Sequence, residues 1–380
     1  MFPPHLFAPY RLRDVTLSNR IAVSPMCQYS AAGGFLNDWH FVHLGSRAVG
    51  GAGLVLTEGT AVSAEGRISP QDLGIWSDDH LSGLARLVSF VHAQGSAAGG
   101  QLAHAGRKSS MSPPWQEPHL VKETDGGWKE ILAPSPIPFS QHSGTPFALD
   151  LQGIRRIQND FRRAAERALE AGFDVVELHA AHGYLFHQFL SPVSNHRSDE
   201  YGGSFENRTR FLLETVELVR QGWPASLPLM VRLSATDWLE SGDGFHLEGV
   251  GWTVEETVRL ARLLRQAGVD LIDVSPGGNL ASATIPTGPG YQTGFAERIR
   301  REAAIPTATV GLITSPEQAD HIVRSGQADL VLLAREMLRN PYWPLAAAQA
   351  LKHDITWPVQ YVRAAGEKKP VRLPYSGRVS

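Results

Sequence analysis

The chain has 380 residues, which is enough for two or three ordinary domains or for one α/β barrel. Its 35 Lys and Arg against 38 Asp and Glu give a net charge of −3, so we expect no basic surface for nucleic acid or an anionic membrane. Hydrophobic residues make up 42% of the sequence and charged residues 19%, which predicts a large buried core and excludes a mainly disordered chain.

The sequence contains a single cysteine, Cys27. It excludes an intrachain disulfide and, within one chain, a cysteine-ligated iron–sulfur cluster or structural zinc site. The first residues lack the basic and apolar regions of a signal peptide, and no apolar run reaches the ~18 residues that a membrane helix needs. We therefore expect a soluble, cytoplasmic protein.

Along the chain, short apolar runs alternate with amphipathic segments. The runs are β-branched or leucine-rich and lack strict polar alternation, which is typical of parallel strands buried on both faces. The predicted strands are Ile21–Ser24, Gly53–Thr57, Ala97–Leu102, Asp174–Leu178, Leu229–Leu233, Leu271–Val274, Thr307–Val310 and Leu330–Leu333.

The segments between these strands carry apolar residues at three- and four-residue spacing, the pattern of a helix with one buried face. Gly95, Gly172 and Gly268 each end such a segment, where glycine typically caps a helix before the next strand. Further helices are predicted over residues 207–220 and 315–325. Strand–helix units in this number predict an α/β fold, a closed (β/α)8 TIM barrel. A doubly wound sheet is the less favoured alternative, because no G-x-G-x-x-G follows any predicted strand.

Two segments depart from this repeating unit. Residues 104–150, after the third strand, are rich in proline and have little periodicity, so we expect a long loop that forms a lid or subdomain at the C-terminal face of the barrel. A solvated insertion is the alternative for residues 115–130. Residues 352–380 contain Trp357 and Tyr361, which favours an interface tail over a flexible one. We expect residues 1–380 to form one barrel domain.

Active sites of such barrels lie at the C-terminal ends of the strands. His179, His182 and Tyr184 follow the fourth strand. The two histidines fit a metal site, structural caps, or a clamp in which two neutral imidazoles hold one carbonyl or nitro oxygen. A metal site is disfavoured because no acidic residue stands as a third ligand. Tyr184 is suited to donate a proton beside such a clamp.

Other polar residues stand near the same ends. Arg232 lies inside the fifth strand, where either a carboxylate or a cofactor must meet its charge. Cys27 is either a small buried hydrophobe or a contact of a redox cofactor. Gly311 and Arg335, after the seventh and eighth strands, are suited to bind a phosphate group. A flavin phosphate fits there, but so does the substrate of a flavin-free lyase or isomerase, and spacing does not separate the two.

Four motifs resemble the Old Yellow Enzyme family of FMN-dependent ene-reductases. They are SPMCQY at residues 24–29, QLAHAGRK at 101–108, HAAHGYL at 179–185 and RSDEYGGS at 197–204. The cysteine of the first motif, with the Gln-Tyr pair after it, is similar to the thermophilic-like branch that includes the bacterial xenobiotic reductases. The resemblance runs from about Phe7 to Arg363, which is nearly the whole chain.

The resemblance implies non-covalently bound FMN at the mouth of the barrel, with NADPH or NADH as the reductant. Gly311 joins the expected cofactor-binding residues through the phosphate argument above. The others are carried over from the family: Ser24, Pro25, Met26, Cys27, Gly59, Gln101, Arg232, Ala334 and Arg335. Relatives commonly have alanine in place of Gly59 and glycine in place of Ala334.

The resemblance also implies the reaction. NAD(P)H reduces the flavin, and hydride then passes from flavin N5 to the β-carbon of an electron-poor alkene, an α,β-unsaturated carbonyl or nitro compound. His179 and His182 would hold the activating oxygen, Tyr184 would protonate the α-carbon, and Tyr29 would line the pocket. The single cysteine excludes an iron–sulfur dienoyl reductase on the same barrel. The family's Gln-Tyr-x-Arg tail implies a homodimer or homotetramer in which Arg363 reaches the neighbouring subunit's substrate.

Overall fold

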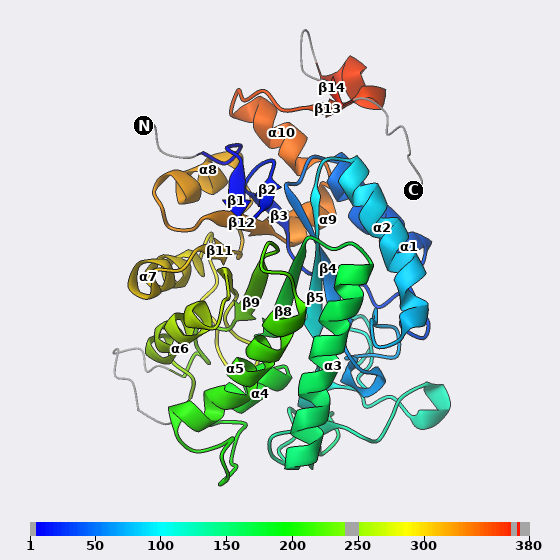
Figure 1. Cartoon of the computed structure of the whole chain (residues 1–380), viewed down its shortest axis with the longest axis vertical. Helices are drawn as coiled ribbons and strands as arrows, with labels where there is room; N and C mark the ends of the chain where they lie inside the picture. Colours follow the sequence, from blue (N-terminus) through cyan, green and yellow to red (C-terminus); the bar gives the residue numbers. More distant parts are fainter. Residues whose placement is uncertain (1–4, 240–250, 366–370, 373–380) are drawn as a thin grey trace.

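The computed structural model describes residues 5–239, 251–365 and 371–372 (Figure 1). Eight parallel strands close a barrel in the order β10-β11-β12-β3-β4-β5-β8-β9. Their bounds are Ile21–Val23 (β3), Leu54–Ala61 (β4), Ala97–Ala103 (β5), Val175–Ala180 (β8), Leu229–Leu233 (β9), Leu271–Val274 (β10), Thr307–Thr309 (β11) and Leu330–Leu333 (β12). Each predicted apolar run forms one barrel strand, so the TIM-barrel prediction is confirmed.

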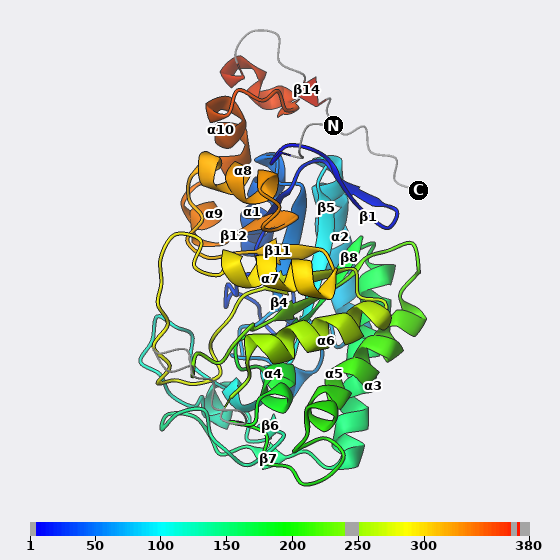
Figure 2. The same ribbon diagram turned by 90° about the vertical axis from the view of Figure 1, so that its left-hand side faces the viewer.

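Helices surround this barrel (Figures 1 and 2). Their bounds are Asp38–Val49 (α1), Leu81–Ala93 (α2), Leu151–Glu170 (α3), Leu185–Leu190 (α4), Phe205–Gly222 (α5), Val254–Gln266 (α6), Thr293–Ala303 (α7), Pro316–Arg324 (α8), Arg335–Arg339 (α9) and Trp343–Ala350 (α10). Gly95, Gly172 and Gly268 have φ angles of 74°, 88° and 95°, the left-handed conformation in which a glycine ends a helix. The helix predicted over residues 207–220 begins two residues earlier in the structure, at Phe205, because the Ser204 side chain caps it by accepting from the Asn207 amide.

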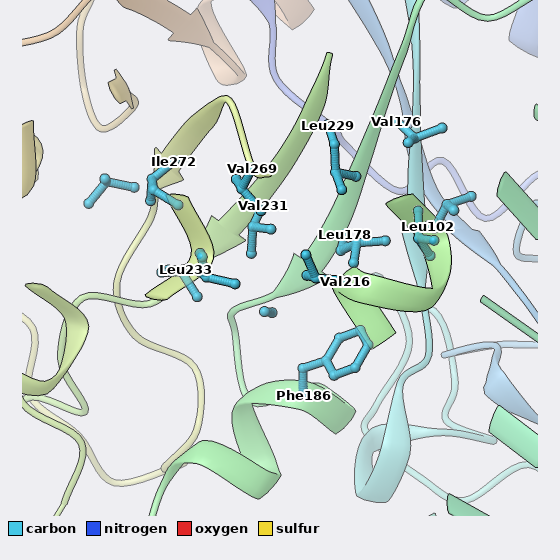
Figure 3. Close-up of a cluster of buried hydrophobic side chains, with 14 of the residues drawn as sticks. Leu102, Val176, Leu178, Phe186, Val216, Leu229, Val231, Leu233, Val269 and Ile272 are labelled. Carbon is cyan, nitrogen blue, oxygen red and sulfur yellow. The ribbon is translucent and has the colours of Figure 1, made fainter. Parts of the chain in front are cut away.

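The hydrophobic core has an inner and an outer part. Inside the barrel, Leu12 and Leu17 of the hairpin β1 (Tyr10–Leu12) and β2 (Val15–Leu17) pack in one cluster with strand residues such as Leu54 and Met230. The outer part fills the space between strands and helices, where Figure 3 shows strand residues such as Leu178 together with helix residues such as Phe186. The hairpin therefore closes the N-terminal end of the barrel and leaves the C-terminal end for the site.

Residues 104–150 form a mostly irregular excursion after β5. The segment contains the short strands β6 (Leu132–Ala133) and β7 (Phe147–Ala148), which pair with each other, and residues 114–120 are exposed. Two of its side chains reach toward the strand ends: the Trp115 ring lies 5.6 Å from that of Tyr29, and the Lys108 ammonium lies 5.2 Å from the centre of the Tyr184 ring. That this segment acts as a lid stays a prediction.

The C-terminal tail lies at the other end of the molecule. Figure 2 shows α10 and β14 (Val371–Arg372) far from β6 and β7, and β13 (Trp357–Pro358) pairs with β14. Trp357 packs with Leu345 and Ala365, whereas Arg363 is exposed. Among the residues with an assigned position, no helix has the length and apolar character that crossing a bilayer takes.

Candidate active site

The two histidines of the predicted clamp lie side by side at the end of β8. Nε2 of His179 and Nδ1 of His182 are 3.2 Å apart, and the amide of Ala181 donates to Nδ1 of His179. This amide leaves the His179 proton on Nε2. The Ser275 hydroxyl lies 2.8 Å from Nε2 of His182, and when it donates there the His182 proton is on Nδ1. One oxygen atom set against both facing nitrogens can then accept from both rings.

Both imidazoles are neutral at pH 7, and the nearby phenol keeps its proton. Burial, and next the charges of neighbouring groups such as Arg232 and Lys108, lower the pKa of His179 and His182 well below the ordinary value. Burial, and next Cys27, raise the pKa of Tyr184 well above its ordinary value. The Tyr184 ring lies 4.7 Å from the His179 ring, so two neutral donors and one protonated phenol share this strand end.

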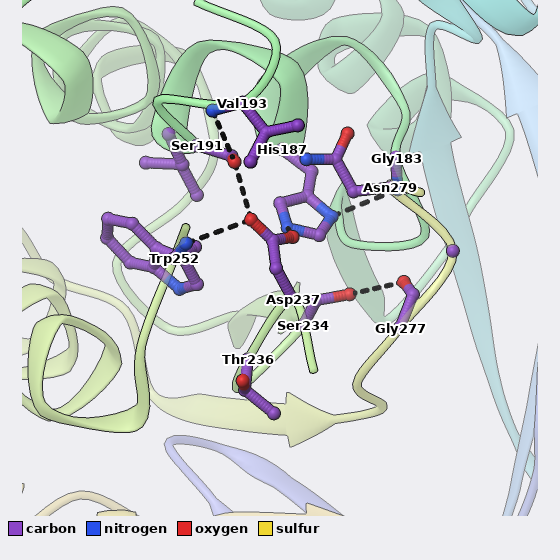
Figure 4. A network of polar contacts seen from close by, with 12 residues as sticks. Gly183, His187, Ser191, Val193, Ser234, Thr236, Asp237, Trp252, Gly277 and Asn279 are labelled. Atoms are coloured by element: carbon purple, nitrogen blue, oxygen red, sulfur yellow. Dashed lines mark hydrogen bonds and ion pairs between the residues drawn. The ribbon is translucent and has the colours of Figure 1, made fainter. Parts of the chain in front are cut away.

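A buried network holds the turn between the clamp and the tyrosine (Figure 4). The amide of Gly183 donates to Nδ1 of His187 at 2.9 Å, and Nε2 of His187 lies 3.0 Å from Oδ1 of Asp237. Asp237 also accepts from the Trp252 amide and the Ser191 hydroxyl. Although burial opposes it, His187 and these hydrogen bonds lower the pKa of Asp237, so the carboxylate is charged and fixes the His187 tautomer.

The same turn is held from two further elements. The Ser234 hydroxyl accepts from the His182 amide at 3.0 Å and donates to the Gly277 carbonyl. The Lys108 ammonium donates to the carbonyls of His182 and Gly278, each at 2.9 Å. Gly183 has a φ of 70°, and a Cβ there would lie 2.3 Å from the Gly278 carbonyl oxygen. Only glycine fits this position, because the turn presses against the loop after β10.

The Asp237 carboxylate gives the first test of this arrangement. In Asp237→Asn the amide nitrogen must face a donor, either His187 or the Trp252 amide, and an unmatched buried donor costs about 1–3 kcal/mol. We expect roughly tenfold weaker binding of a phenolic ligand, measured by flavin absorbance well below the melting temperature. Glu214→Gln is the control, since Glu214 accepts from Tyr201 and Gln158 away from the turn. Equal phenol affinity in both variants would show that the Asp237–His187 network stabilises the fold but does not position the clamp.

A second buried cluster lies inside the strands next to the clamp. Nε of Arg232 lies 2.5 Å from Oδ2 of Asp273, and its Nη2 donates to the Ser24 hydroxyl at 2.9 Å. The Gln101 amide donates to Oε1 of Glu177 at 2.7 Å. Of the two partners foreseen for Arg232, the structure therefore shows a carboxylate. Glu177 and Asp273 were missed by the sequence analysis, although each is a charged residue inside an otherwise apolar strand.

Residues 24–29 leave β3 along the mouth of the barrel, with Ser24 buried and residues 25–29 half-buried. The Gln28 amide donates to Oε2 of Glu58, and Tyr29 has a left-handed φ of 48°. Burial, and next Asp72 and Glu58, raise the pKa of Cys27, so its thiol is protonated. A methyl group at Gly59 would lie 3.8 Å from the Cys27 sulfur, which is an ordinary contact, so glycine in place of alanine changes little here.

The loops after β11 and β12 enclose a cavity of about 120 Å³. Gly311, Ala334 and Arg335, the predicted phosphate-binding residues, line it. Tyr291 and Gln292 of the loop after β10 also line it, as does Arg339, one turn after Arg335 in α9; the sequence analysis gave none of the three a phosphate-binding role. Ser275 lines the same cavity and contacts His182, so the cavity adjoins the clamp.

Gly311 provides a test of this cavity. Its φ is 125°, and a Cβ there would lie 2.9 Å from the Tyr291 ring. Because such strain costs about 1–3 kcal/mol or displaces the loop, we expect Gly311→Ala to weaken FMN binding roughly tenfold or more in a fluorescence titration of the apoprotein. Gly294→Ala is the matched control, since a Cβ at Gly294 meets nothing within 4 Å. Equal affinity in the two variants would exclude the Gly311 loop from the cofactor site.

The site has the features that FMN requires. A guanidinium and an amide, Arg232 and Gln101, lie inside the strands beside the segment 24–29, and the cavity lined by Gly311 and Arg335 can take a phosphate. Within residues 5–239, 251–365 and 371–372, no group of three or more His, Cys, Asp and Glu side chains is arranged to hold a metal ion. The guanidinium, the amide and the cavity suit an organic phosphate-bearing cofactor.

Comparison with known proteins decides the family. Residues 5–354 match the NADH:flavin oxidoreductase / NADH oxidase family. An NADPH dehydrogenase of Geobacillus sp. (strain WCH70) is 52% identical over 360 residues, 94% of this chain and 98% of the relative. The chain belongs to this family. Among solved structures, morphinone reductase has a TM-score of 0.75 at 29% identity, with 93% of this chain and 91% of that chain covered. An old yellow enzyme homologue from Zymomonas mobilis has a TM-score of 0.73 at 27% identity, covering 94% and 95%.

As a member of the Old Yellow Enzyme family, this NADPH dehydrogenase-type oxidoreductase uses FMN as its cofactor and NAD(P)H as its reductant. The family membership removes the flavin-free lyase or isomerase that the phosphate loops had left open. The structure brings the predicted residues of the strand ends together around one barrel mouth. Arg363 is the exception, since it belongs to the tail at the opposite end (Figure 2).

Proposed function

We propose that this flavoenzyme reduces the activated C=C bond of α,β-unsaturated carbonyl or nitro compounds. The observation that carries the proposal is the clamp geometry, in which Nε2 of His179 and Nδ1 of His182 face each other at 3.2 Å beside the Tyr184 ring. Such a pair of neutral donors suits an oxygen that gains negative charge during the reaction. The substrates are small electron-poor alkenes.

When bound, FMN supplies the hydride that NADPH or NADH has delivered to it. The residues of this chain bind and polarise the substrate and supply the proton. His179 and His182 hold the activating oxygen and draw electron density from the alkene, and Tyr29 lines the substrate pocket. Tyr184 donates its phenolic proton to the α-carbon. Burial raises the pKa of Tyr184, so the phenol is protonated at neutral pH and is a weak acid, which suits the protonation of a strongly basic carbanion.

The cofactor would be held without a covalent bond by the residues around the barrel mouth. The amide and guanidinium of Gln101 and Arg232 would face the polar edge of the flavin ring, and the cavity lined by Gly311 would take the phosphate. The complete proposed set is Ser24, Pro25, Met26, Cys27, Gly59, Gln101, Arg232, Gly311, Ala334 and Arg335.

Product analysis tests the proposed reaction. The holoenzyme is incubated without oxygen with NADPH and 2-cyclohexenone, and the products are separated by gas chromatography. We expect one cyclohexanone for each NADPH oxidised, and no 2-cyclohexenol, because the hydride goes to the β-carbon. Consumption of NADPH only in air, with cyclohexenone recovered unchanged, would leave an NADPH oxidase activity and refute the proposal.

We also propose that the active site is completed by a second copy of the chain, in a homodimer or homotetramer. A surface groove of about 640 Å³ lies between α1 and α2 and is lined by apolar residues such as Val42 and Phe90, which are 66% and 39% exposed. Trp39 beside it is 54% exposed. Aromatic and apolar side chains gathered in this way are typical of protein interfaces. A tail at the far end of its own barrel can bring Arg363 to a substrate only in a partner subunit.

Truncation after Thr356 tests this assembly. We expect the shortened chain to sediment as a smaller species and to show a raised substrate KM, because the partner's pocket loses Arg363. FMN should remain bound, since the proposed cofactor residues lie elsewhere. Arg363→Ala is the narrower variant and should raise KM without changing the sedimentation coefficient. A monomeric, fully active wild-type protein at micromolar concentration would contradict the proposal.

The near-neutral net charge of −3 supports small molecules, rather than nucleic acid or a membrane surface, as the partners of this enzyme. A cytoplasmic location stays a prediction.

A further inference from the structure

Three ionisable side chains form a closed cluster inside the barrel. Glu177, Arg232 and Asp273 come from the neighbouring strands β8, β9 and β10, and the side chains are only 0%, 3% and 0% exposed. Nε of Arg232 lies 2.5 Å from Asp273 and 3.8 Å from Glu177. One guanidinium therefore faces two carboxyl groups, and the cluster would carry a net charge of −1 if both were ionised.

The partners of the two carboxyl groups indicate where a proton can be held. Arg232 donates to Oδ2 of Asp273 and Gln101 donates to Oε1 of Glu177, which leaves one oxygen of each carboxyl group. These oxygens, Oε2 of Glu177 and Oδ1 of Asp273, are buried and have no hydrogen-bond partner among the described residues, so a proton can be held on either of them. Two ionised carboxylates that share one guanidinium at a fully buried site repel each other, so the pair keeps one proton.

We propose that Glu177 and Asp273 form a carboxyl pair beneath FMN that holds one proton. At a pH where the pair in the oxidised enzyme has lost this proton, the pair takes it up again when the flavin is reduced. The proposal rests on the proposed contact of Arg232 and Gln101 with the flavin. Gln101 donates to Glu177 and Arg232 to Asp273, so each carboxyl group lies one side chain away from the cofactor. A negative charge gained by the flavin would therefore be felt by the pair.

The protons and electrons balance. NADPH delivers two electrons and one proton to the flavin as a hydride and leaves as NADP⁺. Where the pair of the oxidised enzyme is deprotonated, one further proton comes from solvent and goes to the carboxyl pair, whose charge changes from −2 to −1. If the pair is already protonated, reduction of the flavin takes up one proton per two electrons. If the pair is deprotonated, reduction takes up two protons per two electrons.

The groups around Glu177 determine the pH above which the additional proton is taken up. Burial, and next the charge of Asp273, raise the pKa of Glu177 to about 8, against the opposing effect of Arg232. His179 on the same strand is neutral because its pKa is lowered, and the Cys27 thiol beside Arg232 is protonated because its pKa is raised. The proton uptake should therefore begin above about pH 8, as the oxidised enzyme loses the proton that the reduced enzyme retains.

Spectroelectrochemical titration of the holoenzyme with mediators tests the pair between about pH 6.5 and 9.5. In the wild-type protein we expect the slope of the midpoint potential against pH to double above about pH 8. In Glu177→Gln the slope should stay at its low-pH value throughout, because an amide has no proton to exchange. Asp329→Asn is the matched control: it changes a barrel carboxylate that pairs with Arg300, and it should keep the doubling.

A single slope in the wild-type protein over this range, or a doubling that persists in Glu177→Gln, would overturn the proposal. Infrared difference spectra of the oxidised holoenzyme give a second readout, in which a protonated-carboxyl band should disappear between pH 7 and 9.5 in the wild type and be missing from Glu177→Gln. Should the glutamine variant fail to fold, the wild-type slope alone decides. The titration uses neither NADPH nor an alkene, so it tests the carboxyl pair independently of the proposed reaction. If the enzyme does not reduce cyclohexenone, the slope should still double; if the slope is constant, cyclohexenone reduction is unaffected.

Discussion

Replacing Tyr184 by phenylalanine is expected to slow the reoxidation of the reduced enzyme by cyclohexenone by about 10²- to 10⁴-fold, the usual contribution of a positioned general acid. Reduction by NADPH should change little, because that half-reaction needs no proton from the phenol. The ring contact with His179, at 4.7 Å, uses the face and edge of the ring rather than the hydroxyl, so phenylalanine keeps the packing. Anaerobic stopped-flow absorbance measures both half-reactions separately.

Tyr29→Phe is the matched control, since it removes another phenol with a raised pKa from the same pocket. Its reoxidation rate should fall less than that of Tyr184→Phe. A Tyr184→Phe enzyme that reduces cyclohexenone at the wild-type rate would show that water or another group supplies the proton, and the role given to Tyr184 would be wrong.

The second large effect is expected from the clamp. Changing both His179 and His182 to alanine removes the two donors that meet at 3.2 Å, and removal of one such donor typically costs about 3 kcal/mol in the transition state. We expect binding of phenolic ligands, which imitate the negatively charged oxygen, to weaken by at least 10²-fold, and alkene reduction to fall by more. Flavin absorbance during a ligand titration gives the affinity directly.

His187→Ala is informative beside the double variant. It changes a third buried histidine of the same turn, but one that supports the Gly183 amide and does not face the clamp. Its phenol affinity should fall less than that of the double variant. Undiminished phenol affinity and turnover in the His179 and His182 double variant would refute the clamp.

The barrel was predictable because each of its strands is a short apolar run that local sequence reveals. The clamp residues were predictable for a related reason: His179, His182 and Tyr184 follow one strand within a few residues, so their proximity needs no tertiary information. The motif resemblance then supplied their roles. Arg232, Gln101 and the loops of Gly311 and Arg335 were also expected to lie together, because the C-terminal ends of all strands in a closed parallel barrel lie at the same end of the barrel.

The supporting residues could not be predicted in this way. Asp237 meets His187, and Ser275 meets His182, only because the barrel brings different strand ends together. Asp273 and Glu177 did carry a signal, a charge within an apolar strand, but no sequence spacing shows that both face Arg232. Contacts between elements far apart in the chain thus determine the tautomers and the charge balance of the site.

The tail shows a different limit. Trp357 and Tyr361 indicated packing, and Trp357 is indeed buried against Leu345, whereas Arg363 is exposed and the contact proposed for it needs a second copy of the chain. The exposed apolar residues of α1, such as Val42 at 66%, carry no mark in the sequence that distinguishes them from core positions. Only the structure shows that they lie at the surface.

Double-mixing stopped-flow without oxygen tests the central claim most directly. The holoenzyme is first mixed with NADPH until the flavin absorbance is bleached, and then with 2-cyclohexenone in the absence of further NADPH. The account predicts full recovery of the flavin absorbance, with one cyclohexanone formed per flavin, in the wild-type enzyme and a rate lowered by at least 10²-fold in Tyr184→Phe. A bleached flavin that cyclohexenone leaves unchanged, but that regains its absorbance on mixing with oxygen, would contradict it.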